Sequence, residues 1–143
     1  MAKLYIVATP IGNLGDISFR ALEVLKQVSV VVAEDTRVTL KLFSHYEIKK
    51  PLFAYSYQVD SPKNNHLLDL LRGGQDVALV TDAGTPGISD PGGKIVERVW
   101  KELGEQVQII PIPGPNAALA ALSISGLPTD KFLFLGFPPH KKG

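Results

Sequence analysis

The sequence predicts an α/β protein with a mainly parallel five-stranded sheet and helices on both faces. Short apolar segments alternate strictly with helix-like segments along the 143 residues. The apolar segments are continuous rather than alternating, which is typical of parallel strands that are buried on both faces. The composition, 45% hydrophobic and 20% charged, is that of a globular chain long enough to bury a core.

Five apolar runs are expected to form the strands. They are Leu4–Ala8, Val28–Ala33, Leu52–Tyr55, Val77–Thr81 and Val107–Ile112. The helices between and after them are bounded by Ser, Asp, Pro and Gly residues, which are common at helix ends. They run from about Ile17 to Gln27, Arg37 to Tyr46, Pro62 to Gly73, Pro91 to Gly104 and Pro115 to Gly126. Asp16 and Asp90 are candidate helix caps.

A last strand-like run covers Lys131–Phe137 and leads into a basic, proline-marked segment. The length predicts one domain, but this run has no helix behind it. We therefore expect residues 1–130 to form an N-terminal α/β domain and residues 131–143 to begin a linker or a second domain.

Composition excludes several classes of function. The absence of cysteine excludes a disulfide scaffold, a thiolate zinc site and a cysteine nucleophile. The net charge of +1 indicates no strong field for nucleic acid. The uncharged stretch from Gln106 to Thr129 is long enough to span a bilayer, but its four prolines argue against a membrane helix.

Glycine and proline are concentrated where strands are expected to end. The chain has 13 Gly and 11 Pro, and 13 of these residues fall in the windows Thr9–Asp16, Asp82–Gly93 and Pro111–Ala117. Each window follows a predicted strand, and ligands of open α/β sheets bind outside the carboxyl ends of the strands. Backbone without side chains lets a ligand approach closely. The three windows therefore predict a ligand site at one edge of the sheet.

The obvious nucleotide motifs are absent. Gly92-Gly93-Lys94 resembles the end of a phosphate loop, but Ile88 stands where the first glycine is needed, and Ile95 where a magnesium-binding hydroxyl is needed. The acidic and basic run from Glu34 to Arg37 ends an apolar strand, where unpaired charges would be costly. Asp35 and Arg37 are the candidate catalytic pair, and no metal ligand set is predicted.

Four motifs together resemble the ribosomal RNA small-subunit methyltransferase I family, a branch of the tetrapyrrole-methylase superfamily. They are YIVATPIGNLGD at Tyr5–Asp16, AEDTR at Ala33–Arg37, TDAGTPGISDPG at Thr81–Gly92 and PGPNA at Pro113–Ala117. The resemblance implies S-adenosylmethionine-dependent 2′-O-methylation of a cytidine ribose in 16S ribosomal RNA. It also implies two α/β domains with the cofactor in the cleft between them, and this chain matches only the first of them.

The superfamily's cofactor positions carry over where these motifs align. They are Pro10, Ile11, Asp82, Ala83, Gly84, Thr85, Ile88, Asn116 and Ala117. The superfamily's glycine-rich first loop is replaced by Ala8–Asn13, and Thr85 stands in place of its Gly-Asp-Pro aspartate. Both departures match the ribosomal RNA branch and argue against a tetrapyrrole substrate.

The chemistry that the resemblance implies needs little more than positioning and a proton acceptor. Asp35 is expected to accept or orient the ribose hydroxyl proton, and Arg37 to hold a phosphate or to order Asp35. The expected partners are 16S ribosomal RNA or the small ribosomal subunit and a second copy of the chain in a homodimer, in the cytoplasm and without a membrane. Two alternatives stay open: a magnesium-dependent phosphotransfer or phosphohydrolase domain, and a non-enzymatic RNA-binding or dimerisation module.

Overall fold

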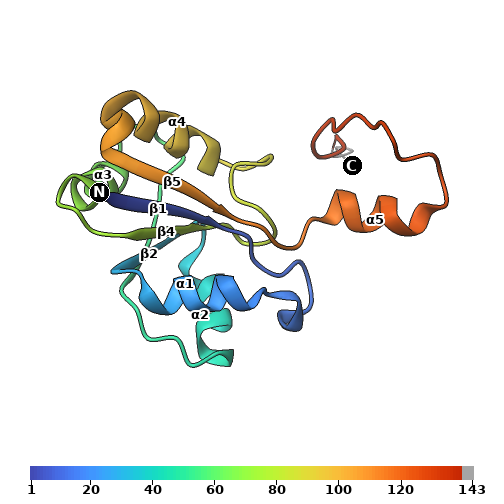
Figure 1. The fold of residues 1–143 in the computed structure, drawn as a ribbon, viewed down its shortest axis with the longest axis horizontal. Helices are drawn as coiled ribbons and strands as arrows, with labels where there is room; N and C mark the ends of the chain where they lie inside the picture. Colours follow the sequence, from blue (N-terminus) through green and yellow to red (C-terminus); the bar gives the residue numbers. More distant parts are fainter. Residues whose placement is uncertain (140–143) are drawn as a thin grey trace.

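The computed structural model describes residues 1–139 and has the predicted α/β fold (Figure 1). Over these residues one sheet contains five strands. They are β1 (Ala2–Val7), β2 (Val30–Ala33), β3 (Leu52–Ala54), β4 (Val77–Val80) and β5 (Val107–Ile112). Their order in the sheet is β3-β2-β4-β1-β5, and every neighbouring pair is parallel. The predicted fold class is therefore confirmed.

The helices begin and end within about two residues of the predicted bounds. They are α1 (Phe19–Gln27), α2 (Thr36–His45), α3 (Pro62–Arg72), α4 (Gly92–Leu103) and α5 (Ala117–Ser125), with short 3-10 turns η1 (Leu14–Asp16) and η2 (Gly104–Gln106). Side-chain caps explain why several helices begin where they do. Ser61 accepts from the Asn64 amide at the start of α3, and Asn116 accepts from the Leu119 amide at the start of α5.

The prediction that Asp16 caps α1 was wrong. Residues 14–16 form the 3-10 turn η1, and the helix begins after it, where the Ser18 side chain accepts from the Ala21 amide at 3.1 Å. Asp90 lies two residues before Gly92, the first residue of α4, and its Oδ1 accepts from the amides of Gly87 and Gly92 at 2.8 and 2.7 Å. Asp90 therefore binds an amide of the first turn of α4, as a cap does.

Two apolar layers hold the helices to the sheet. One cluster lies between the sheet and α3 and α4, and includes Leu4, Leu79, Leu67, Leu68 and Val99. The other lies between the opposite face and α1 and α2, and includes Val7, Val31, Val80, Leu25 and Phe43. Alternate residues of each central strand point to opposite layers, which explains why the strands are apolar throughout.

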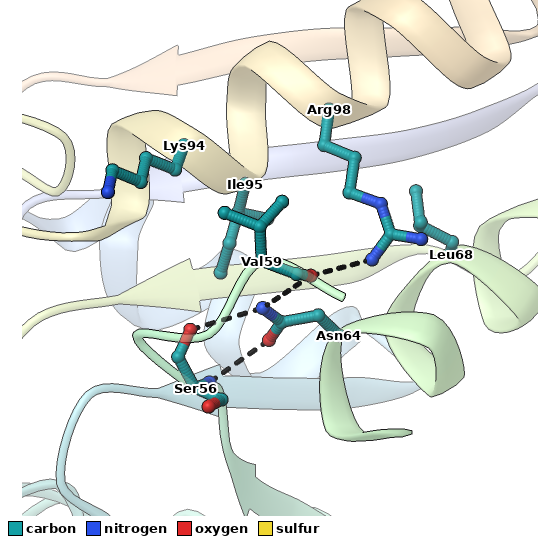
Figure 2. Close-up of a pocket in the computed structure, with 7 residues that line it drawn as sticks. All are labelled: Ser56, Val59, Asn64, Leu68, Lys94, Ile95 and Arg98. Atoms are coloured by element: carbon teal, nitrogen blue, oxygen red, sulfur yellow. Dashed lines mark hydrogen bonds between the residues drawn. The ribbon is translucent and has the colours of Figure 1, made fainter. Parts of the chain in front are cut away.

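The connection between β3 and α3 is held by one buried side chain, Asn64 (Figure 2). Its Nδ2 donates to the carbonyl oxygens of Ser56, Gln58 and Val59 at 3.1, 2.9 and 3.2 Å, and its Oδ1 accepts from the Ser56 amide at 3.0 Å. The pocket beside it, about 10 Å³, has room for no more than about one water molecule. This region is therefore a packed support and not a ligand site.

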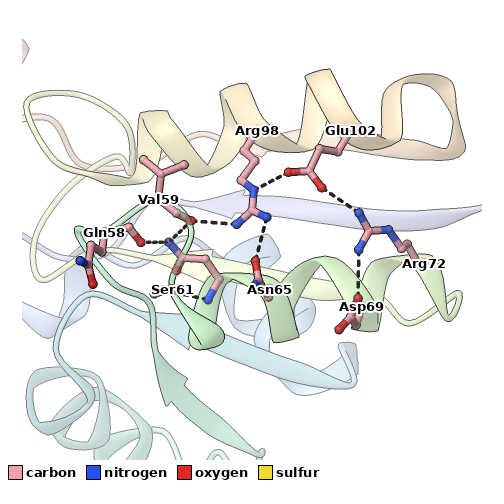
Figure 3. Close-up of polar contacts among 9 residues, drawn as sticks. Gln58, Val59, Ser61, Asn65, Asp69, Arg72, Arg98 and Glu102 are labelled. Carbon is pink, nitrogen blue, oxygen red and sulfur yellow. Dashed lines mark hydrogen bonds and ion pairs between the residues drawn. The ribbon is translucent and has the colours of Figure 1, made fainter.

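Charged side chains then tie α3 to α4 (Figure 3). Arg98 donates to the Val59 carbonyl oxygen and to Asn65 Oδ1, both at 2.7 Å, and also pairs with Glu102. Glu102 accepts in turn from Arg72 at 2.7 Å. The β3–α3 connection carries Tyr57, whose hydroxyl reaches Glu34 at the end of β2, so this network positions a residue of the strand-end edge.

Replacing Asn64 by alanine is expected to lower the free energy of unfolding by about 1–3 kcal/mol, because buried backbone groups lose their partner. Urea denaturation followed by circular dichroism measures the change. Lys63→Ala, an exposed neighbour on the same helix, is the matched control and should change stability by less than about 0.5 kcal/mol. Equal effects of the two substitutions would contradict the role given to Asn64.

The last described segment departs from prediction. No strand forms over Lys131–Phe137, because its backbone finds no sheet partner among the described residues. It follows α5, which stands clear of the sheet in Figure 1 and has no buried residue. Exposed apolar side chains gather here, with Ile124, Leu133, Leu135 and Phe137 each at least 79% exposed. The predicted linker's last four residues, 140–143, lie outside the described residues.

Within residues 1–139, no helix is both long and apolar enough to cross a membrane.

Candidate functional site

The loops that follow β1, β4 and β5 meet at the carboxyl edge of the sheet. Thr9 and Gly84 exchange backbone hydrogen bonds, with Thr9 N–H donating to the Gly84 oxygen at 2.9 Å and Gly84 N–H to the Thr9 oxygen at 3.0 Å. A Cβ built at Gly114 would lie 2.8 Å from Ala8 Cβ, so the loop after β5 can approach β1 only because residue 114 is glycine. The predicted gathering of the three windows at one edge is confirmed.

The structure brings most of the predicted cofactor residues together around this contact. Gly84 is buried with φ +81°, and a Cβ on it would lie 3.6 Å from the Ile11 side chain and 3.7 Å from the Pro115 carbonyl oxygen. Pro10 is buried beside them, and Ala83 and Thr85 flank Gly84. Asn116 and Ala117 begin α5. Ile88 lies further along the loop and is 54% exposed.

The loop segment from Asp82 to Thr85, with Ile11 and Pro115 beside Gly84, forms a rim that suits a polar ligand. Between described residues, the amides of Ala83 and Thr85 donate no hydrogen bond, so both donors are available. Glycine at position 84 lets the loop adopt the φ of +81° between these two amides, while its own N–H and C=O pair with Thr9. The rim therefore offers backbone donors to a small polar ligand.

The predicted catalytic pair forms a close ion pair at the start of α2. Arg37 Nε and NH2 donate to Asp35 Oδ1 and Oδ2 at 3.0 and 2.7 Å, and the Arg37 amide donates to Oδ1 at 2.9 Å. These bonds to Arg37 lower the pKa of Asp35 to about 2. The Arg37 side chain remains 86% exposed. Asp35 is thus a weak proton acceptor that holds an outward-facing guanidinium.

Glu34 was not among the predicted site residues, yet it connects three strand ends. Its carboxylate accepts from the Thr81 hydroxyl at 2.5 Å, from the Asp82 amide at 3.2 Å and from the Tyr57 hydroxyl at 3.0 Å. Glu34 therefore fixes the end of β4 against the end of β2. The sequence signal that could have found it is the pair of adjacent carboxylates at a strand end.

Asp82 lies where these groups converge. Its Oδ1 accepts from the Asp35 amide at 3.1 Å. Partial burial, and then the neighbouring charges of Glu34 and Asp35, raise the pKa of the Asp82 carboxyl group above its ordinary value of 3.8. Of the two aspartates at this edge, Asp82 is the better proton acceptor and Asp35 the weaker.

Asp82→Asn is expected to raise the free energy of unfolding at pH 7. The raised pKa means that the folded state binds the proton more tightly than the unfolded chain, so stability falls as pH rises through 3.8. Asparagine removes the repulsion and keeps an oxygen for the Asp35 amide. Urea unfolding should show the gain at pH 7 and lose it near pH 3. Glu23→Gln, on the exposed face of α1, is the control and should show no such difference.

A pocket of about 210 Å³ opens between the loop after β1 and helix α2, and we call it the loop–helix pocket. Its walls are apolar side chains, and its polar groups come from the ends of β1 and β4 and from α2. The lining residues are Thr9, Pro10, Gly12, Asn13, Leu14, Val38, Thr39, Lys41, Leu42, Thr81 and Asp82. Sequence reasoning missed Val38 and Leu42, although their helical spacing places them on one face of α2 with Lys41, a residue that the basic bias of this helix already marks as a candidate for RNA contact.

Known proteins are similar to this chain in sequence and in fold. The chain is 49% identical over 142 residues to "Ribosomal RNA small subunit methyltransferase I" of Thermotoga maritima and 51% identical over 139 residues to the protein of that name in Escherichia coli O157:H7. These matches cover 99% and 97% of this chain, but 63% and 48% of the relatives. The resemblance found in the motifs is therefore confirmed, and the chain spans about half to two thirds of the length of these relatives.

Solved structures agree on the fold. Uroporphyrin-III-C-methyltransferase from Thermus thermophilus matches with a TM-score of 0.62 and 26% identity, over 89% of this chain and 54% of that protein. The methyltransferase CobJ matches with a TM-score of 0.65 and 19% identity, over 90% and 52%, which is a likeness of fold alone. The family model for tetrapyrrole (corrin/porphyrin) methylases matches residues 3–137. The chain therefore belongs to the tetrapyrrole (corrin/porphyrin) methylase family.

Proposed function

We propose that this chain takes part in S-adenosylmethionine-dependent 2′-O-methylation of a cytidine ribose in 16S ribosomal RNA. The observation that carries the proposal is the identity of about 50% over nearly the whole chain to proteins named as small-subunit ribosomal RNA methyltransferases. The position of the cytidine hydroxyl as acceptor rests on the family resemblance of the four strand-end motifs. Neither a magnesium phosphotransferase nor a non-enzymatic module is favoured by these relatives.

The proposed cofactor site is the rim around Gly84. Bound S-adenosylmethionine supplies an electrophilic methyl group on a sulfonium sulfur. Pro10, Ile11 and the 82–85 segment would line it, with Ile88 and the Asn116-Ala117 start of α5 at its borders. The positive-φ turn at Gly84 and the amides of Ala83 and Thr85, which donate no hydrogen bond between described residues, support this assignment.

Asp35 and Arg37 are assigned to substrate positioning. Because the pKa of Asp35 is about 2, its role in the proposal is to orient Arg37 rather than to take a proton. Arg37 presents an exposed guanidinium that is already held in a fixed direction, which suits a phosphate of the RNA backbone. A guanidinium fixed in advance loses less entropy when it binds.

Residues 1–130 are proposed to be one of two domains of the whole protein, and residues 131–143 to lead toward the second. The greater length of the relatives supports this. So does α5, an apolar helix whose residues are all at least partly exposed, because helices that are apolar all round are normally covered. We further propose that the whole protein is a homodimer, as the resemblance implies. It would act in the cytoplasm, where ribosomal RNA is assembled into ribosomes.

Primer extension at low nucleotide concentration tests the proposed function. Small-subunit RNA is treated with the whole protein and S-adenosylmethionine, and reverse transcription should then stop at one cytidine. The stop should be absent when the cofactor is omitted. A stop at a residue other than cytidine, or no cofactor-dependent stop, would refute the proposal.

A further inference from the structure

We propose that the loop–helix pocket receives the target ribonucleoside, turned out of the RNA, and that Asp82, one of its lining residues, accepts the proton of the reactive 2′-hydroxyl. This inference rests on the proposed function and deepens it. It assigns the substrate a place in this chain and gives the proton a named acceptor.

The size of the pocket suits a single base. About 210 Å³ is many times the roughly 10–15 Å³ that admits a single water molecule, so the pocket has room for a planar ring. Pro10, Leu14, Val38 and Leu42 give the walls apolar surface. Enzymes that modify nucleosides commonly hold an extruded base between aromatic or apolar side chains.

The walls of the pocket are fixed before any ligand binds. The Tyr46 hydroxyl, just after α2, donates to the Leu14 carbonyl oxygen at 2.6 Å. At the other end of the same loop, Thr9 is paired with Gly84. The loop after β1 is therefore tied to α2 on one side and to the β4 loop on the other. A pocket that is preformed in this way avoids the entropy cost of ordering its walls.

The charges on α2 suit a nucleic-acid chain at the pocket. Lys41 lines the pocket, and Arg37 lies four residues earlier on the same helix, so the two cations are neighbours on one face. Phosphates on either side of an extruded nucleotide would meet such a pair. The chain as a whole is nearly neutral, with a net charge of +1, so this local pair, rather than a general basic surface, gives the complementarity.

Asp82 lies at the boundary between the loop–helix pocket and the cofactor rim, since it lines the pocket and is followed directly by Ala83 and Gly84. In the proposal, the hydroxyl of a nucleoside in the pocket attacks a methyl group on the rim beside this carboxylate. Only Oδ1 is used, by the Asp35 amide, among the described hydrogen bonds. Oδ2 is left to accept.

The proposed step balances in atoms and charge. The ribose oxygen forms a bond to the methyl carbon while the sulfur–methyl bond of S-adenosylmethionine breaks. The bonding pair of electrons stays on sulfur, which becomes a neutral thioether. The hydroxyl proton passes to Asp82. The charged and titratable groups around Asp82 are Glu34 from β2, Asp35, Arg37 and Lys41 from the start of α2, and Tyr57 behind Glu34.

The pocket is tested by RNA binding, without cofactor or turnover. Fluorescence anisotropy measures the Kd of the whole protein for an RNA oligonucleotide that spans the methylated cytidine, and for the same oligonucleotide with that base removed. Val38→Trp fills the pocket, whereas Leu40→Trp places the same side chain on an exposed position of α2. We expect Val38→Trp to weaken binding by about tenfold or more and Leu40→Trp by less than about twofold.

Removal of the base should weaken wild-type binding as strongly as Val38→Trp does, and should have little further effect on that variant. Equal affinity of Val38→Trp and wild type, or equal losses in both tryptophan variants, would overturn the pocket. If Val38→Trp does not fold, Lys41→Gln replaces it. In that variant, the slope of log affinity against log salt concentration should fall by about the amount that one phosphate contact contributes. An unchanged slope would overturn the proposed contact between Lys41 and an RNA phosphate.

Asp82 is tested by the pH profile of methylation. Asp82→Asn should lower kcat by about 100-fold or more and abolish the rise of the rate with pH at the acid limb. Asp35→Asn should keep that limb, because Asp35 acts through Arg37. If the methylation rate of Asp82→Asn still rises with pH at the acid end of the profile, Asp82 is not the proton acceptor. If the wild-type protein does not methylate cytidine at all, the proposed function fails instead, and the two failures are thereby separated.

Discussion

Gly84→Val in the whole protein is expected to lower methylation by about 100-fold or more, because displacement of reacting groups by about 1 Å can cost that much. Gly84 has φ +81°, a region that a β-branched residue adopts only under strain of about 1–3 kcal/mol. The residue also exchanges two backbone hydrogen bonds with Thr9. Strain at this point therefore moves both the cofactor rim and the neighbouring wall of the loop–helix pocket.

Gly74→Val is the matched control for backbone strain. Gly74 has φ +83° in the turn between α3 and β4, away from the carboxyl edge, and a Cβ there meets nothing within 4 Å. Both variants should lose a similar free energy of unfolding, but only Gly84→Val should lose methylation and S-adenosylmethionine affinity measured by calorimetry. A similar loss of activity in both would mean that the effect comes from stability alone.

Arg37→Ala is expected to lower methylation by about 10- to 100-fold, the equivalent of a charge-assisted hydrogen bond of about 1.5–3 kcal/mol to an RNA phosphate. The fold should be unchanged, because the side chain is 86% exposed. Single-turnover assays with limiting RNA measure the change. Arg37→Lys should recover little, since a lysine cannot reproduce the two-pronged contact with Asp35.

Asp35→Ala is expected to have a similar effect, because Arg37 then loses its fixed direction. The double variant should be little worse than either single variant, as for residues that act as one unit. Thermal unfolding of each variant controls for loss of the helix cap, which costs about 1 kcal/mol. Rates close to wild type in either single variant would refute the positioning role of the pair.

Much of the fold follows from local sequence signals. Apolar runs and capping residues such as Ser61 fix where elements begin, because strand burial and helix capping depend on nearby residues. The gathering of the Gly- and Pro-rich windows at one edge also follows, since consecutive parallel strands point the same way. The order β3-β2-β4-β1-β5 does not follow, because it depends on which strand faces match in three dimensions.

The candidate site was predictable only in part. Asp35 and Arg37 are adjacent in the chain, and their pairing could be read locally. Glu34 stands beside Asp35 in the same acidic pair, which marks its position, but its partners could not be predicted locally, because successive residues of an extended chain point to opposite sides. Its side chain reaches Thr81 and Tyr57, residues 47 and 23 positions away. The loop–helix pocket was missed for the same reason, because its two walls meet only after β1 has entered the sheet.

Lys131–Phe137 shows the opposite error. Its apolar content predicts a strand, but a strand also needs a partner for its amides and carbonyls, and composition says nothing about partners. In the structure this segment turns back after α5 (Figure 1), and a Cβ at Gly136 would lie 3.4 Å from Ser89 Oγ, but the segment pairs with no strand. The same reasoning explains why α5 was predicted correctly, since a helix satisfies its own backbone.

The strand order also governs the timing of assembly. Strand β1 is synthesised before the other four described strands, yet its two neighbours are β4 and β5, with Leu4 beside Val77 and Ala2 beside Val107. The strands that pair with β1 are therefore synthesised only after more than half of this chain. Such long-range parallel pairing is slow to form, and the intermediates expose apolar surface that is prone to aggregate. The centre of the sheet is thus among the last parts of the fold to form. The loops at the strand ends cannot take up their final positions before β1 has paired with β4 and β5.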